Sequence, residues 1–254
     1  MSSFVINPYR FAAASTFVPT DISGLQLWLD ATVGLYDATT GGSEVTTDGS
    51  AVARWEDQSG NGNHVTQATA GNRPELKTAI QNGNNVVRFT AANSDQMVAA
   101  STIFTGTNPR TFFLVAKATS TGQVGMYGMG GSGTAGTAFD VTPEIYIRVV
   151  NRQDFDQSMG TTDFRLLTIR FPSGGNIGDI EGWLDGSAMI GTPTLTAAID
   201  TATTVVFKIG RAAQGSIGHC GGDYCEFIGY DQELSDTDRE SVETYLANKW
   251  DITI

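Results

Sequence analysis

Cysteine and histidine are scarce in this sequence of 254 residues, which contains two of each. Two cysteines cannot build the disulfide framework of a small secreted domain, so Cys220 and Cys225 are expected to be free, partly buried thiols. With only His64 and His219 as histidine bases, and no Gly-x-Ser-x-Gly elbow beside them, nothing favours nucleophilic catalysis. A zinc site formed by His219, Asp223 and the two cysteines would rest on one Cys-x4-Cys pair, which is weak evidence.

Charge is also in short supply, because only 17% of the residues are charged. Fifteen basic residues face 27 acidic ones, which gives a formal net charge of −12. No cluster of lysine and arginine appears in the sequence, so we expect no nucleic-acid partner and no anionic membrane surface. No apolar run approaches the roughly 20 residues that span a bilayer, which argues against membrane insertion.

Glycine, by contrast, is abundant at 30 residues and gathers in clusters such as 59–63 and 173–178. Between these turn signals lie short segments in which apolar and polar residues alternate, or in which nearly all residues are apolar, as in half-buried and central strands. The expected strands cover residues 25–30, 86–89, 111–118, 145–150, 164–171, 180–184, 205–209 and 224–230. The pattern predicts an all-β sandwich of two packed sheets in one domain, residues 21–254.

One helix is predicted, over residues 235–250. Ser235 is a good N-cap, and two aspartates in the first turn complement the helix dipole. The residues at helical spacing that should pack on the sandwich are Val242, Tyr245, Leu246 and Trp250. The residues expected to face solvent are Glu240, Glu243 and Lys249.

Several segments together resemble a known family. They are LQLWLDA (25–31), VARWEDQSGNGNHVTQ (52–67), RPEL (73–76), NVVRF (85–89), GWLDG (182–186) and the closing segment 221–250. This arrangement resembles the laminin-G/concanavalin A-like jelly-roll domains of phages and environmental bacteria, from about Leu25 to Trp250. The resemblance implies a two-sheet antiparallel jelly roll with a C-terminal helix. One departure is Cys225, which stands where a small apolar residue is expected and should therefore face the core. The ligand is left open, since this fold serves many functions.

Residues 1–20 lack the order of a secretion signal, because Arg10 follows the apolar residues that it should precede. We expect an extended N-terminal arm, which Pro8 and Pro19 keep from forming a regular helix. The segment FVINPYRFAAA resembles the N-termini of phage structural proteins. The apolar arm residues expected to contact neighbouring subunits are Phe4, Ile6, Tyr9 and Phe11.

These observations predict a non-enzymatic phage virion protein, either a capsid decoration or a tail-associated component. It would be assembled in the host cytoplasm and exposed on the particle as a homo-oligomer or in arrayed copies. Its partners would be other virion structural proteins and, in addition, cell-surface glycans. The alternative is a carbohydrate-binding or adhesion module, and a glycoside hydrolase is a distant third.

The most distinctive local motif is the loop 57–63, DQSGNGN. Its oxygen-bearing side chains at alternate positions resemble the first half of an EF-hand loop, so calcium ligation by Asp57, Ser59 and Asn61 is one interpretation. The twelfth position is Ala68 instead of the glutamate that completes such a site, which favours the other interpretation, a turn capped by an aspartate. A glycan could bind beside the same loop, and the residues expected to bind it are Trp55, Asp57, Asn61 and Asn63.

A glycosidase would need two carboxylates that flank the scissile bond. The nearest group is Asp179, Glu181 and Asp185, which strand spacing would place on one face. Their order and spacing differ from the Glu-x-Asp-x-x-Glu arrangement of concanavalin-like glucanases, and Asp185-Gly186 is typical of a hairpin turn. We therefore expect no catalytic residues.

Overall fold

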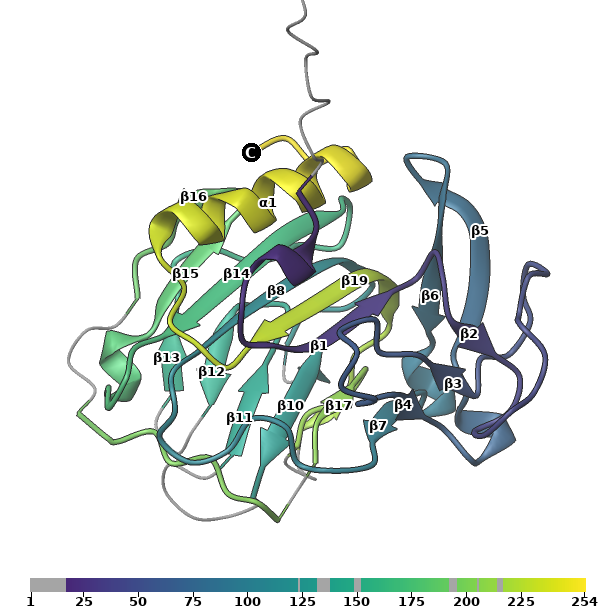
Figure 1. Cartoon of the computed structure of the whole chain (residues 1–254), viewed down its shortest axis with the longest axis horizontal. Coiled ribbons are helices and arrows are strands. Elements are labelled where there is room, and N and C mark those ends of the chain that lie inside the picture. Colours follow the sequence, from purple (N-terminus) through teal and green to yellow (C-terminus); the bar gives the residue numbers. More distant parts are fainter. Residues whose placement is uncertain are drawn as a thin grey trace, which may run out of the picture.

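The computed structural model describes residues 17–122, 124–131, 138–148, 152–191, 196–204, 206–213 and 217–254. The arm residues Phe4, Ile6, Tyr9 and Phe11 lie outside these ranges. The described residues form two antiparallel sheets that face one another, with a C-terminal helix over the outside of the first sheet (Figure 1). This is the predicted two-sheet sandwich with one helix. None of the described helices is long and apolar enough to cross a bilayer.

The first sheet contains the long strands. Its order is β16 (Ser187–Ala188), β15 (Glu181–Leu184), β14 (Arg165–Phe171), β8 (Arg110–Ala118), β19 (Gly222–Tyr230), β6 (Asn84–Phe89) and β5 (Glu75–Gln81). β1 (Leu25–Asp30) pairs with the second half of β19, whereas β6 pairs with its first half. Every residue of β19 is buried, and β8 lies between β14 and β19. The prediction that the apolar segments form central strands is therefore confirmed for β8 and β14.

The second sheet is built from shorter strands. Its order is β13 (Arg152–Asp154), β12 (Tyr146–Arg148), β11 (Ala138–Val141), β10 (Tyr127–Gly130), β17 (Lys208–Ile209), β7 (Met97–Ala99), β4 (Val65–Thr66), β3 (Arg54–Trp55) and β2 (Leu35–Tyr36). A separate parallel pair joins β9 (Val124–Gly125) to β18 (Gly218–His219). Short 3-10 turns complete the fold: η1 (Pro19–Asp21), η2 (Ala70–Asn72), η3 (Ala91–Asn93) and η4 (Ile177–Asp179).

Aromatic rings fill the space between the sheets. Phe112 and Phe227 from the first sheet meet Tyr127 and Phe207 from the second. The ring centroids of Tyr127 and Phe227 lie 5.0 Å apart, and those of Phe207 and Phe227 lie 4.8 Å apart. Cys220 and Cys225 are free thiols buried in this core cluster, as expected. Burying these rings supplies the main driving force for pairing the two sheets.

Helix α1 (Asp236–Trp250) begins after the predicted N-cap, because the Ser235 hydroxyl accepts a hydrogen bond from the Asp238 N–H at 3.1 Å. It lies along β14 and β8, and its Trp250 ring is fully buried (Figure 1). The prediction of a solvated polar face is wrong for two residues. Glu243 is only 1% exposed and accepts a hydrogen bond from Thr168, and the Lys249 ammonium lies 2.8 Å from the carboxylate of buried Glu226.

Candidate functional site

The loop 57–63 is folded around the carboxylate of Asp57. Its Oδ1 accepts hydrogen bonds from the N–H groups of Trp28 and Ser59, both at 2.9 Å. Its Oδ2 accepts from the Ser59 hydroxyl at 2.7 Å and from the Asn63 N–H at 2.9 Å. A carboxylate has about four acceptor positions, and all four are used. As folded, the carboxylate offers no lone pair to a calcium ion, so ligation by Asp57, Ser59 and Asn61 would require breaking these bonds. The geometry of the loop is that of the aspartate-capped turn, the second of the two interpretations from the sequence.

The two asparagines of this loop hold it against β1. The side-chain amide of Asn61 donates to the Leu25 carbonyl at 2.8 Å, and that of Asn63 donates to the Gln26 carbonyl at 2.8 Å. Both amides are therefore occupied in fixing the loop, and a glycan contacting them would compete with the backbone of β1.

Trp55 does not lie on the surface. Its side chain is 0% exposed, and its indole N–H donates to the Asp30 carbonyl at 3.0 Å. Stacking on a sugar requires an exposed ring face. The prediction that Trp55 stacks on a glycan is therefore wrong, because the short strand β3 places the ring in the core.

The three carboxylates considered for glycoside hydrolysis have separate roles. Asp179 lies in η4, where it accepts from the Asn176 N–H at 2.8 Å, so it is not on the strand face that spacing predicted. Glu181 pairs with Arg170 at 2.7 Å, and Asp185 sits at positive φ (48°) in the hairpin between β15 and β16, as its Asp-Gly sequence predicted.

A metal centre finds no geometric support in the part of the chain that the structure describes. No three His, Cys, Asp or Glu side chains gather there as metal ligands would. The structure therefore does not bring His219, Cys220, Asp223 and Cys225, the grouping considered from sequence, together as ligands of one ion.

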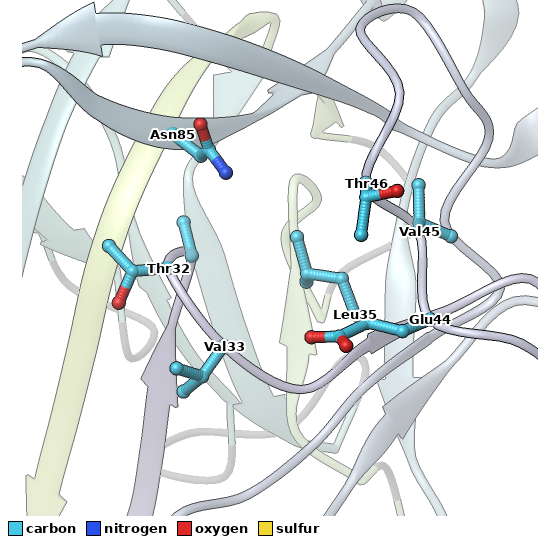
Figure 2. Close-up of a pocket in the computed structure, with 8 residues that line it drawn as sticks. Thr32, Val33, Leu35, Glu44, Val45, Thr46 and Asn85 are labelled. Carbon is cyan, nitrogen blue, oxygen red and sulfur yellow. The ribbon is translucent and has the colours of Figure 1, made fainter.

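The structure shows a different candidate site, a pocket at the end of β1 next to β2 (Figure 2). Its volume is about 110 Å³. The residues that line it are Ala31, Thr32, Val33, Leu35, Glu44, Val45, Thr46 and Asn85. A second, more open hollow of about 360 Å³ shares Glu44, Val45 and Thr46 and continues to Asp37, Ser50 and Arg73. The two hollows together form a groove, called here the Glu44 groove.

The floor and rim of the Glu44 groove differ in chemistry. Ala31, Leu35 and Val45 form an apolar floor and are 0%, 3% and 8% exposed. Glu44 and Asn85 stand on opposite sides of the pocket, with the carboxylate and the amide directed toward the space between them (Figure 2). The site thus offers apolar contact below and hydrogen bonding from the sides.

The polar groups of the rim are free to bind a ligand. Among the described residues, the Glu44 carboxylate, the Thr46 hydroxyl and the Asn85 amide nitrogen make no hydrogen bond within the protein. Backbone pairing fixes the segment that carries Glu44 and Thr46, because the Val45 N–H donates to the Leu35 carbonyl at 2.8 Å, and Asn85 lies in strand β6. The rim is therefore preorganised, which lowers the entropic cost of binding.

The Glu44 groove and the predicted loop lie at opposite ends of β1. Asn63 bonds to Gln26 near the start of the strand, whereas Ala31 follows its end. Five residues of strand separate these points, roughly 17 Å. Glu44 and Asn85 form no recognisable motif, because they are far apart in the sequence and meet only through the pairing of β2 and the position of β6.

Comparison with known proteins gives a fold and no family. No family model matches the chain, and no curated protein matches it. Among solved structures, it is similar to the binding domain of Paraclostridial Mosquitocidal Protein 1 (11% identity, TM-score 0.58, 91% of this chain and 54% of that chain). It is also similar to an arabinofuranosidase complexed with arabinofuranosyl-alpha-1,2-xylobiose (17%, 0.52, 79% and 51%) and to Trypanosoma rangeli sialidase (10%, 0.50, 90% and 33%).

These likenesses show that the chain shares its fold with parts of these proteins. The chain spans only a third to about half of the length of these proteins. At such identities the comparison establishes the fold alone, and activity has to be argued from the site.

Proposed function

We propose that this chain is a carbohydrate-binding module that recognises a glycan without cleaving it, and that the Glu44 groove is its binding site. The observation that carries the proposal is the open groove with an apolar floor and an unpaired polar rim. Sugars present C–H faces and hydroxyl groups together, which is the chemistry that such a lining complements.

Each rim group has a defined part in this proposal. The Glu44 carboxylate accepts hydrogen bonds from sugar hydroxyls, and the Asn85 amide nitrogen donates to them. The Thr46 hydroxyl does either. A charged acceptor makes the stronger bonds, so Glu44 contributes most of the polar affinity.

The arrangement of carboxylates in the groove supports binding of a glycan without its cleavage. Glycoside hydrolysis uses two carboxylates flanking the bond to be broken. Glu44 is the one carboxylate that lines the smaller hollow, and Asp37 in the larger one accepts a hydrogen bond from the Ser43 N–H at 2.8 Å. The solved structures that share the fold include a toxin's binding domain, which supports a recognition role.

A place in a virion, as a capsid decoration or tail-associated protein arrayed with other virion proteins, stays a prediction. A glycan-binding module exposed on a particle would be compatible with it. Calcium binding also stays a prediction, and the bonds around Asp57 oppose it at the loop 57–63.

The test is affinity electrophoresis through gels containing neutral polysaccharides, with arabinan, arabinoxylan and dextran as the first panel. We expect one of them to retard the wild type, and Glu44→Ala to weaken that binding by at least about tenfold, as for a lost bond to a charged group. Glu144→Ala is the matched control, because Glu144 is also exposed and unpaired but lies away from the groove. Equal binding by Glu44→Ala and the wild type would refute the assignment of the groove.

A further inference from the structure

Among the residues whose side chains the structure describes, two basic ones have no hydrogen-bond or ion-pair partner. Every other lysine and arginine whose side chain the structure describes makes a hydrogen bond or an ion pair, for example Arg88 with Asp223 at 2.6 Å. Lys208 and Arg211 make none. Because the chain carries 27 acidic residues against 15 basic ones, carboxylates are available in excess, yet neither cation forms an ion pair or a hydrogen bond with a described carboxylate.

The fold gathers these cations on one side of the second sheet. Phe207 and Ile209 are buried in the core, so Lys208 between them points to the outer face of β17. Gly210 then turns the chain with φ of +81°, where a Cβ would lie 2.4 Å from the Phe89 ring. After this turn Arg211 forms a β-bridge with His219 of β18.

Lys208, Arg211 and His219 are close enough to repel one another, and they are called here the basic cluster. Burial lowers the pKa of His219, and the charges of Arg211 and Lys208 lower it further. Burial and the charge of Arg211 likewise lower the pKa of Lys208, whereas the charge of Asp140 raises it. Three basic groups thus share one site at a cost in free energy.

Two nitrogen atoms of the basic cluster are buried without a hydrogen bond, Nε of Arg211 and Nε2 of His219. A buried polar atom with no hydrogen-bond partner destabilises the folded protein. The Nε–H of Arg211 can only donate, so a ligand that supplies acceptor oxygens would satisfy it and would also reduce the repulsion between Arg211 and Lys208. The unpaired cations and the unsatisfied nitrogen atom therefore both favour the binding of an anion.

We propose that the basic cluster is a second binding site, which takes an anionic group of an acidic glycan, either a carboxylate or a sulfate. The glycan nature of the ligand rests on the proposed function, whereas its negative charge rests on the cluster alone. A nucleic acid is the poorer match, because the net charge of −12 repels a dense polyanion and no aromatic side chain belongs to the cluster to stack on bases.

The probes are three polysaccharides: polygalacturonate for carboxylate, dextran sulfate for sulfate and dextran as the neutral control. Titration calorimetry at low salt is expected to show binding of one acidic polymer, weakened at least about tenfold in Lys208→Gln/Arg211→Gln. Lys77→Gln is the matched control for Lys208→Gln, since it removes the same single positive charge from a pair with Glu75 elsewhere. It is expected to bind as the wild type does.

A thermal melt of each variant checks that it is folded. Because the variant loses a repulsion, it is expected to unfold at the wild-type temperature or above, and the acidic polymer is expected to raise the melting temperature of the wild type alone. If the double variant fails to fold, Lys208→Gln alone carries the test, because Lys208 lies on the outer face of the sheet.

Three results would overturn the proposal. These are no binding of either acidic polymer, equal losses in Lys77→Gln and the cluster variant, or equally tight, cluster-dependent binding of single-stranded DNA. Failure here is separable from failure of the proposed function. Retardation by a neutral glycan that depends on Glu44, together with no binding of either acidic polymer, would retain the Glu44 groove and discard the basic cluster.

Discussion

The two faces of the first sheet are both covered, but by different chemistry. The inner face meets the second sheet through aromatic rings, such as Phe112 against Tyr127, whose ring centroids lie 5.9 Å apart. The outer face meets α1 through apolar residues mixed with buried charge, at Glu226 and Glu243. The inner face is therefore held by shape and apolar area, and the outer face also by directional bonds.

Glu226 organises the outer interface. Its Oε1 accepts from the Trp28 indole N–H at 2.6 Å and the Tyr245 hydroxyl at 3.0 Å. Its Oε2 accepts from the Trp250 indole N–H at 2.7 Å and lies 2.8 Å from the Lys249 ammonium. A buried carboxylate is tolerated only with such complete partnering. The bonds also fix the position of the helix along the sheet, which apolar contact alone would leave free to slide.

The largest effect is expected from Trp250→Ala. The change removes a fully buried ring and leaves Oε2 of Glu226 with one donor fewer. We expect a loss of about 3–5 kcal/mol in the free energy of unfolding, measured by urea denaturation. Trp250→Phe separates the two causes, because it keeps an aromatic ring but no N–H group. Full recovery in Trp250→Phe would show that the bond to Glu226 contributes nothing, and that the two faces do not differ as described.

Glu226→Gln should have an intermediate effect. The amide cannot accept at all four positions and carries no charge to pair with Lys249, so we expect a loss of about 2 kcal/mol. Glu240→Gln on the exposed part of the same helix is the control and should stay within about 0.5 kcal/mol of the wild type. Equal stability of the two variants would contradict a structural role for the buried carboxylate.

Ser235→Ala tests the start of the helix and should cost about 1 kcal/mol, because the first turn loses its cap. The expected readout is a lower midpoint in thermal or urea unfolding. An unchanged midpoint would mean that packing of the outer face holds the helix start without the cap.

The smallest effect expected is a pH dependence. Burial, and next the nearby Asp30, raise the pKa of Glu226 above its usual 4.5. The folded protein then takes up this proton at a higher pH than the unfolded chain does. This contribution to stability is complete below pH 4.5 and is lost as the pH rises through the raised pKa. The free energy of unfolding should be measured for the wild type and Glu226→Gln at pH 7 and pH 5. The wild type is expected to exceed the variant by more at pH 5 than at pH 7. A gap that stays constant or narrows would contradict the shift.

Strands could be predicted from the sequence where their hydrophobic pattern is long. The apolar strand β8 and the alternating strand β1 each span six or more residues, and both were predicted. Several strands of the second sheet, such as β3 and β7, have only two or three residues, in which alternation cannot be recognised. The sequence therefore did not reveal that Trp55 in β3 is buried.

Partners that are distant in sequence explain the other differences. Helical spacing placed Glu243 and Lys249 in solvent, because a helix pattern contains no information about Thr168 or Asp30 across the interface. The Asp57 loop was recognised as a unit, but the direction of its oxygens depends on the Trp28 N–H of another strand. Likewise, the Glu44 groove joins Glu44 to Asn85, and only the folded sheet brings them together.

The central claim, that a glycan binds in the Glu44 groove, is tested most directly by mapping amide chemical shifts during a titration with the polysaccharide that retards the wild type. Recognition at the groove predicts that the largest changes fall on Thr32, Glu44, Thr46 and Asn85, while the amides of residues 57–63 stay unchanged. Changes centred on residues 57–63, or spread evenly over both sheets, would contradict it.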